Sequence, residues 1–559
     1  MRNHPNRAGR LRLLPLPSAA ALISAAALIN IAALAAAGCE RRSEALRGGQ
    51  PASPRRGGTA VIGWTAEPSG VNELVGTSTQ VTSEMLRKLF LHLVEEQPDF
   101  ERHPPTFTPL LARSYDWSPD HKLLTFHLRD DVTWSDGVPV TADDVRWSWQ
   151  AQKDPRVAWN YSYVKARITD AEVVDPHTVR FHFSRAYATQ MLDVNEGLIL
   201  PKHAWEKLPF DQWKRGADWF KQHLVVDGPF TIESWRPQQE VVLRRNPRYF
   251  DQPRPYLERV VFRIVPSQAN LVAQFLDGEL DFDPAVNPAD AARIAANPRL
   301  ELFPTWFRSW VGVAWNTTNP LFADPEVRRA LTLAIDRETI VRTLWGRYAR
   351  VADSPIVAEA WAHGRSLRPW PYQPDEARRI LAAKGWTPGA GGILRRGGEP
   401  FAFELTTNTG NQQRVDALVM IQEQLRRIGV RAQPRPVEFN TLNSRLDSGA
   451  FEAVVMGQTM DTGLDLTAFF HSRSIDKANF TRYANPQVDR LIEASMSHPD
   501  ISLARPELER IQDILHRDQP YSFLWESQRL HGISRRIHDA RPTMTWSLFN
   551  LADWWVEGR

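Results

Sequence analysis

Cysteine is almost absent from this sequence. Cys39 is the single cysteine among 559 residues, so no disulfide can form within the chain. The HExxH, CxxC, phosphate-loop and GxSxG patterns are also missing. Histidines are scattered without metal-ligand spacing on a recognisable helix, and serines and acids are too common to nominate a catalytic triad without geometry. We therefore expect a protein that is not an enzyme, with no catalytic residue, no metal and no cofactor.

An excess of charge of one sign is also missing. The formal net charge is +3, and it becomes −1 when four arginines of the extreme N-terminus are left out. These are Arg2, Arg7, Arg10 and Arg12, which lie in a segment that we expect to be removed. A nearly neutral chain gives no reason to propose a nucleic-acid partner.

Length and composition indicate a soluble protein with more than one core. A chain of 559 residues is too long for a single hydrophobic core. The hydrophobic fraction of 42% and the charged fraction of 24% are ordinary for globular proteins. The 21 tryptophans are unusual, and their large amphipathic rings suit either a core or an aromatic-lined pocket.

The one long apolar run lies at the N-terminus. Basic residues end at Arg12, and residues 19–38 are apolar apart from Ser24 and Asn30. Small residues before a cleavage point predict a signal peptide over residues 1–38. The cysteine that comes next resembles a bacterial lipobox, in which Cys39 is lipidated and becomes the first residue, although Ala36 stands where leucine is usual.

An uncleaved membrane anchor is the alternative, since about 20 apolar residues can span a bilayer. Both interpretations place the remainder of the chain outside the cytoplasm. Residues 39–56 are rich in Arg, Gly, Pro and Ser, and they predict a flexible tether. From residue 57 onward, strands alternate with helices, which indicates an α/β fold with mixed sheets.

Residues 310–340 contain the most informative pattern. Val311, Val313 and Trp315 alternate with smaller residues and predict a half-buried strand. After a polar turn, Asp324 can cap a helix whose first residue is Pro325. Spacing alone indicates only an ordinary strand–loop–helix unit.

The same stretch closely resembles the segment N-P-L-F-x-D-x-x-V-R-x-A-L-x-x-A-I-D-R of the family 5 solute-binding proteins. These are the extracytoplasmic receptors of peptide and nickel ABC importers. The resemblance covers about residues 57–530 and has further matches in the family's order, at 57–72, 128–145, 227–282, 372–386, 448–452 and 519–524.

The resemblance implies a type II periplasmic-binding-protein clamshell. Its first lobe would comprise residues 57–315 and 525–559, with an extra subdomain at about 100–200, and its second lobe residues 316–524. The implied function is capture of an oligopeptide and its delivery to an ABC permease, by a monomer that is lipid-anchored in the periplasm or at the cell surface. A nickel chelate, haem, opine or oligosaccharide is the alternative ligand, and a secreted hydrolase is the alternative class.

The predicted ligand-binding loop is 458–465, because it comes after the strand 453–456 and α/β folds bind ligands past strand ends. In peptide receptors of the family, the matching loop carries an aspartate that binds the peptide's α-ammonium group. Asp461 is the closest match and Asp465 competes with it. The alternative for both is an ordinary loop or cap carboxylate.

Five further residues are ligand-binding candidates. Gln458 and Thr459 belong to the same loop, and Asn408 comes after the predicted strand 401–406. Trp315 and Asn316 lie where the resemblance places the crossover between lobes, so a ligand would be held against them.

Overall fold

One mixed sheet of 11 strands organises the computed structural model, which describes residues 53–76 and 79–557. Along its main path the strand order is β18-β17-β19-β12-β20-β11-β1-β10-β9-β8, with β13 paired to β20. Strands β17 and β18 are parallel, as are β1 and β10, whereas β12 and β20 are antiparallel. The predicted α/β class with mixed sheets is confirmed. The predicted signal peptide, Cys39 and most of the tether lie outside the described residues.

The bounds of the main-sheet strands are β1 Thr59–Trp64, β8 Phe230–Arg236, β9 Glu240–Arg245, β10 Arg259–Ile264, β11 Phe282–Asp283, β12 Leu300–Trp315, β13 Ala349–Arg350, β17 Ala402–Asn408, β18 Arg431–Val437, β19 Ala453–Thr459 and β20 Tyr521–Ser534. A separate four-stranded sheet contains β4 Ala112–Trp117, β5 Leu123–Leu128, β6 Ile168–Asp175 and β7 Thr178–Phe183. This sheet lies inside the predicted subdomain at 100–200.

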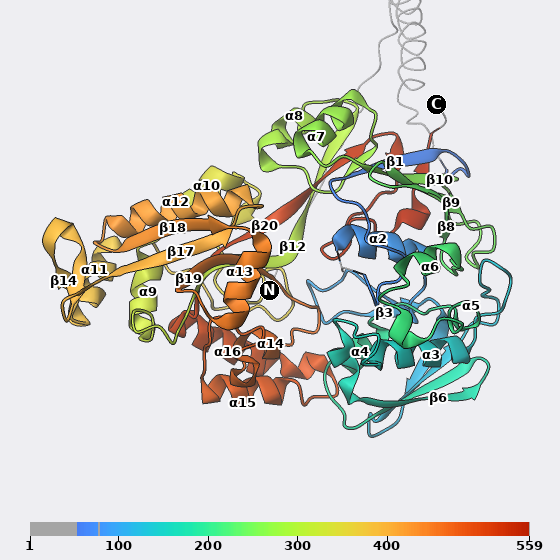
Figure 1. Cartoon of the computed structure of the whole chain (residues 1–559), viewed down its shortest axis with the longest axis horizontal. Coiled ribbons are helices and arrows are strands. Elements are labelled where there is room, and N and C mark those ends of the chain that lie inside the picture. The colour runs from blue at the N-terminus through green and yellow to red at the C-terminus, as the bar shows by residue number, and fades with distance from the viewer. Residues whose placement is uncertain (1–52, 77–78, 558–559) are drawn as a thin grey trace, which may run out of the picture. The chain divides into compact units, whose positions relative to one another are not determined.

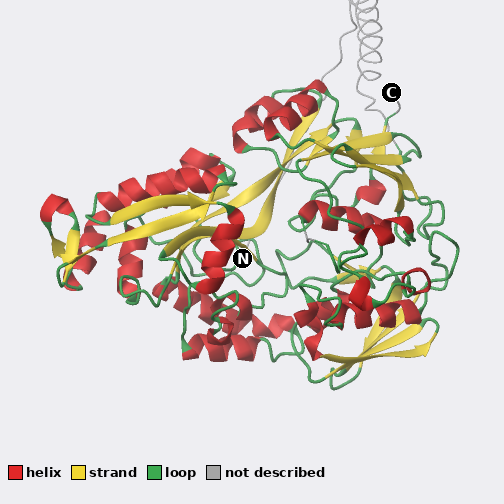
Figure 2. Cartoon of the chain, in the orientation of Figure 1, coloured by secondary structure: helices red, strands yellow, loops and turns green. Residues whose placement is uncertain are grey.

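The helices that matter for the site are α2 Gln80–Leu89, α4 Gln190–Asn195, α9 Pro325–Leu333, α10 Arg337–Trp345, α12 Gln412–Arg426, α13 Phe439–Ser448, α14 Thr467–Phe470 and α16 Arg505–Asp518, with the 3-10 helix η2 at Ser162–Arg167. Figure 2 shows helices on both sides of the sheet portion that contains β17–β19. Of the helices described in residues 53–76 and 79–557, none is long and apolar enough to span a bilayer.

Two long strands connect the two ends of the main sheet. β12 pairs with β19 on one side and with β20 on the other, and β20 also pairs with β11. Figure 1 shows β12 and β20 running side by side from β17–β19 toward β1 and β8–β10. The predicted strand at 311–315 is thus the last third of a longer strand that begins at Leu300.

Successive side chains of β12 and β19 point to opposite faces of the sheet, and each face packs into its own hydrophobic core. Val313 and Trp315 pack with Val455 on one face, while Ala314 and Val454 pack on the opposite face. This is the period of two that a strand buried on both sides requires. The next helix begins as predicted, since Asp324 Oδ1 accepts a hydrogen bond from the Glu326 N–H at 2.8 Å.

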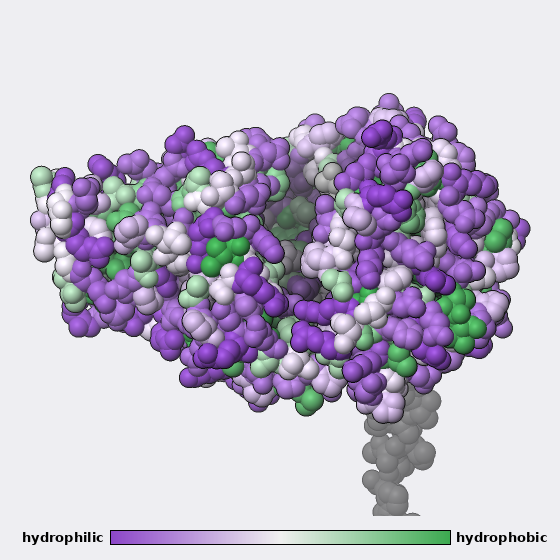
Figure 3. Space-filling view, turned by 60° about the horizontal axis from the view of Figure 1, so that its bottom comes forward, coloured by the Kyte–Doolittle hydropathy of each residue, from purple (hydrophilic) through white to green (hydrophobic). Residues whose placement is uncertain are grey.

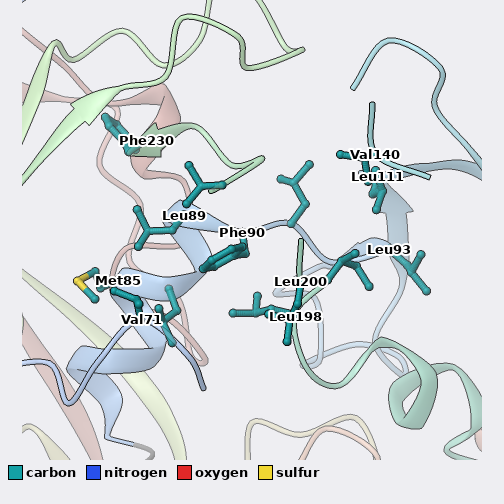
Figure 4. Packing of buried hydrophobic residues seen from close by; sticks show 14 of the residues in the cluster. Val71, Met85, Leu89, Phe90, Leu93, Leu111, Val140, Leu198, Leu200 and Phe230 are labelled. Atoms are coloured by element: carbon teal, nitrogen blue, oxygen red, sulfur yellow. The ribbon is translucent and has the colours of Figure 1, made fainter. Parts of the chain in front are cut away.

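A third cluster of buried hydrophobic side chains surrounds α2. Figure 4 shows Met85, Leu89 and Phe90 among buried side chains that include Leu198 and Phe230. Contacts join residues 55–559 into one compact unit, so the lobe boundaries expected from the sequence stay a prediction.

Candidate functional site

The predicted loop lies at the carboxyl ends of two neighbouring parallel strands. β19 ends at Thr459 and β17 ends at Asn408, and the two strands pair in parallel through Leu405 and Ala453. Asn408 is almost buried, and its Oδ1 accepts a hydrogen bond from Arg414 Nη1 at 3.2 Å. Thr459 is exposed at the strand end. The fold thus brings Asn408 and Thr459 to the same edge of the sheet.

Asp461 is accessible to solvent, yet protein surrounds it. Desolvation, with repulsion from Asp465 second, raises the pKa of Asp461 to about 7, while Arg308 opposes the shift. Exposure of the side chain together with strong desolvation indicates a concave position. Figure 3 shows that this protein's surface is deeply hollowed between two masses. A carboxylate in a concave site can bind a cation without giving up a full hydration shell.

Asp465 has a local structural role. Its Oδ1 accepts a hydrogen bond from the Thr467 N–H at 2.9 Å, at the start of α14. Its own N–H donates to Asp461 Oδ1 at 3.3 Å. A carboxylate at a helix start satisfies an otherwise unpaired N–H, so this geometry matches the cap alternative for Asp465.

Gln458 points into the core on the other side of the strand. Its side chain is buried beside the hydroxyl of Tyr521, and its Nε2 has no hydrogen-bond partner among the described residues. The Gln458 amide therefore faces the core rather than the solvent that a ligand would enter from.

Trp315 and Asn316 are fixed in the core. Trp315 has no accessible surface, and its Nε1 donates to Ser522 Oγ at 3.0 Å. Asn316 is 6% exposed, and its Nδ2 donates to the carbonyl of Phe451 at 2.9 Å. Both side chains are held in the core at the end of β12, so both are closed off from solvent in this conformation.

A tyrosine of a distant segment, Tyr163, faces the loop, and Tyr161 lies beside it. Desolvation, with repulsion from Asp461 second, raises the pKa of Tyr163 to about 12. The Tyr163 and Tyr161 ring centroids lie 6.4 Å apart, and both rings are exposed. Sequence analysis missed these residues, because a Tyr-Ser-Tyr run at the start of η2 carries no specific signal until the fold brings Tyr163 to Asp461.

The Tyr-bearing segment is fixed by a buried lysine. Lys165 Nζ donates to the carbonyls of Asp193, Val194 and Glu196, at 2.6, 3.1 and 2.6 Å, and so caps the C-terminal end of α4. The loop approaches the same helix, because a Cβ added at Gly463 would lie 2.7 Å from Thr189 Cγ2. Loop, α4 and η2 thus form one packed arrangement.

Arg308 contacts the loop from β12. Its side chain donates a hydrogen bond to the carbonyl of Met460, and the Met460 N–H donates to the Arg308 carbonyl at 2.9 Å. Nearby, burial raises the pKa of Glu96, although the hydroxyl of Thr462 and the charge of Arg308 lower it. In the described parts of the chain, no three His, Cys, Asp or Glu side chains are grouped to hold a metal ion.

A family model and several known proteins match this chain over most of its length. Residues 106–479 match the family model described as bacterial extracellular solute-binding proteins, family 5 Middle. Oligopeptide-binding protein AppA of Bacillus subtilis is 28% identical over 518 residues, which cover 90% of this chain and 92% of AppA. Heme-binding protein A of Haemophilus influenzae is 25% identical over 491 residues, with 83% of this chain and 85% of that protein covered.

A solved structure agrees over nearly the whole fold. The structure of AppA from Bacillus subtilis in complex with a nonapeptide matches with a TM-score of 0.77 and 27% identity, and covers 90% of this chain and 100% of that one.

Proposed function

Because the chain belongs to family 5 of the bacterial extracellular solute-binding proteins, we propose that it captures oligopeptides outside the cytoplasm and delivers them to the permease of an ABC importer. The observation that carries this proposal is Asp461, an accessible carboxylate at the carboxyl edge of the sheet, with Tyr163 opposite and Tyr161 next to Tyr163. AppA, a relative over nine-tenths of the chain, was solved with a peptide. The hydrolase alternative has no support in these comparisons.

The proposed mechanism is closure of two lobes over the peptide. The lobes are residues 57–315 with 525–559 and residues 316–524, joined at the crossover strands β12 and β20. Every peptide with a free N-terminus offers an ammonium group, whatever its side chains. Asp461 offsets the cost of burying that ammonium, and the tyrosine rings supply apolar area with a polar edge. Haem is the second candidate, because one relative is named a heme-binding protein.

Calorimetry on Asp461→Ala tests the proposed role of that carboxylate. Loss of one partner of a buried charge pair costs about 2–5 kcal/mol, mostly as faster release. N-acetylated peptides should bind the parent protein poorly and lose little more in the variant. Asp465→Ala is the matched control, and its effect should be smaller. Equal peptide affinity in Asp461→Ala and the parent, or haem binding without peptide binding, would overturn the proposal.

We also propose a lipid anchor at Cys39 that holds a monomer on the outer side of the membrane. Two acyl chains give stable membrane attachment where one gives only marginal binding. Cys39→Ala should therefore release the protein from the membrane fraction or block its processing, as fractionation and mass measurement would show. A variant that is cleaved at the same bond and stays membrane-bound contradicts the anchor.

A further inference from the structure

A short hairpin projects from a fixed base in the predicted first lobe. Its strands are β2 Val94–Glu96 and β3 Phe107–Pro109, which pair antiparallel. Asn195, the last residue of α4, donates a hydrogen bond to the Val94 carbonyl at 3.0 Å and accepts one from the Val94 N–H at 3.1 Å. The base of the hairpin is therefore held by the first lobe, and residues 97–106 form its tip.

The tip places one aromatic ring in the core of the predicted second lobe. The Phe100 side chain is 3% exposed and belongs to the hydrophobic cluster on one face of β12 and β19. Apart from Phe100, Met544 and residues of β12, the buried members of this cluster in the described chain lie within residues 316–524. Phe107 of the same hairpin instead packs against the first-lobe cluster around α2. Two phenylalanines of one hairpin thus belong to the cores of different lobes.

Hydrogen bonds fix the tip in this position. The Trp361 N–H donates to the Phe100 carbonyl at 3.0 Å, and the Trp361 ring lies in the same cluster as the Phe100 ring. Within the tip, Asp99 Oδ1 accepts a hydrogen bond from the Thr106 N–H at 3.2 Å. The tip is therefore held both internally and by the segment that it contacts.

The same cluster carries the proposed ligand loop. Met460 and Leu464, which stand on either side of the candidate carboxylate, are 1% exposed and belong to the cluster that contains Phe100. Leu464 has a φ of 51°, a left-handed conformation that is strained for leucine and is kept only where the surroundings hold it. The hydroxyl of Thr462 in this loop makes a hydrogen bond to the Glu96 carboxyl of the hairpin. Loop and hairpin are therefore packed together.

Separation of the two lobes would expose the Phe100 ring. Contact of an apolar ring with water costs free energy in proportion to the exposed area, and aromatic side chains bury large areas. Other contacts between the two lobes include single hydrogen bonds, from the Ala188 N–H to the Met496 carbonyl at 3.2 Å and from Gln413 Nε2 to Asn287 Oδ1 at 2.9 Å. Water replaces most of the strength of such bonds, so the buried ring favours closure more than they do.

We propose that Phe100 is a positioning residue that latches the two lobes around a captured peptide and holds the ligand loop in place. The latch rests on the proposed peptide capture and adds a residue that acts without contacting the peptide. A peptide binds tightly only to the closed arrangement, so the latch raises the affinity of every peptide by the same factor, through the fraction of protein that is closed. This separates Phe100 from Asp461, which acts on the ammonium group.

Calorimetry with two tetrapeptides tests the latch. Ala-Ala-Ala-Ala and Ala-Phe-Ala-Ala are titrated into the full-length protein and its variants. Phe100→Ala should weaken the binding of both by the same factor, about tenfold or more, because a buried ring is lost from the contact between lobes. Phe100→Leu keeps an apolar side chain and should stay within about threefold of the parent. Phe107→Ala is the matched control and should also stay within about threefold, because its ring packs in the first lobe.

Hydrogen exchange gives a measurement that needs no peptide. In Phe100→Ala, the amides of residues 356–362 and 458–466 should exchange faster than in the parent, whereas Phe107→Ala should leave them unchanged. Thermal melting checks that each variant is folded. If Phe100→Ala is not, Met544→Ala takes its place, because Met544 is the other side chain that enters this cluster from the first lobe outside β12.

The affinities decide when the parent binds both peptides. Binding of both peptides by Phe100→Ala as tightly as by the parent overturns the latch and leaves peptide capture intact. A loss confined to one peptide, or an equal loss in Phe107→Ala, also overturns it. If neither peptide binds the parent, peptide capture fails and the exchange rates decide: equal exchange in Phe100→Ala and the parent overturns the latch, and faster exchange in Phe100→Ala supports it for another ligand.

Discussion

Asp461 must be ionised to bind an ammonium group, but its surroundings favour the neutral form. The pKa of the free carboxyl is raised to about 7. Peptide affinity should therefore fall as the pH is lowered through 7, by up to about tenfold per pH unit below it. Calorimetry between pH 5.5 and 8 would measure this. Asp461→Asn should bind weakly at every pH, and a parent protein with constant affinity over this range would contradict the prediction.

The raised pKa of Asp461 affects folding stability in the opposite direction: peptide affinity should rise with pH, whereas stability should fall. An aspartate whose pKa is higher in the folded than in the unfolded state lowers stability as the pH rises from about 4 to 7, because the folded protein then loses its extra proton. Asp461→Asn should thus melt at a higher temperature than the parent at pH 8 and at nearly the same temperature at pH 4. The pH dependence of peptide affinity and that of the melting temperature would together distinguish a ligand-binding carboxylate from a helix-capping one. A capping carboxylate contributes stability rather than reducing it.

At the residue scale, the sequence predicted the loop after a strand but not the side chains that the fold brings to this loop. The loop at 458–465 was predicted from strand order and from the family segment. Tyr163 and Arg308 carried no signal, because their significance depends on the strand pairing of β12 and on the placement of η2. Trp315 fitted a binding wall by position, but a tryptophan on a strand with helices on both faces is buried.

At the scale of elements, the segment Asp227-Gly228-Pro229-Phe230 secures the end of α2. The Gly228 N–H donates to the Leu89 carbonyl at 2.8 Å, and a Cβ at Gly228 would lie 2.7 Å from that same carbonyl group. Asp227 Oδ1 accepts a hydrogen bond from the Leu91 N–H at 3.0 Å. A glycine is required here by close backbone approach, although its φ is not positive.

Gly228→Ala should therefore destabilise the protein by about 1–3 kcal/mol, since backbone atoms cannot move aside as a side-chain end can. The urea midpoint would report the loss. Gly70→Ala is the matched control, because a Cβ at Gly70 meets nothing within 4 Å and should change stability little. Equal midpoints for the two variants would show that α2 can shift without cost.

Elements with local signals were the easiest to predict. The Asp324 cap and Pro325 gave the start of α9. The length of β12 was not predictable from alternation, because residues 301–309 expose both faces and the register with β20 shifts between Trp306 and Trp310. Which strands neighbour one another was not predicted, since periodicity carries no information on pairing.

At the scale of the whole molecule, closure over a peptide should make the protein more compact. A tetrapeptide that binds in calorimetry should reduce the radius of gyration measured by solution scattering, because hinge closure brings two lobes together around the ligand. Asp461→Ala at the same peptide concentration serves as the control and should change less. An unchanged profile at saturation would exclude a clamshell mechanism.

The late position of β20 also bears on when this chain can fold. β20 is the partner of both β11 and β12, and Leu300 pairs with Ser534 only after the ribosome has made almost the whole polypeptide. Pairing between residues so distant in the sequence is slow, because the intervening loop must close first. A nascent chain that lacks β20 therefore cannot complete its main sheet. For a chain whose N-terminus is predicted to be an export signal, we expect this order of synthesis to leave the main sheet incomplete when that signal has already been made.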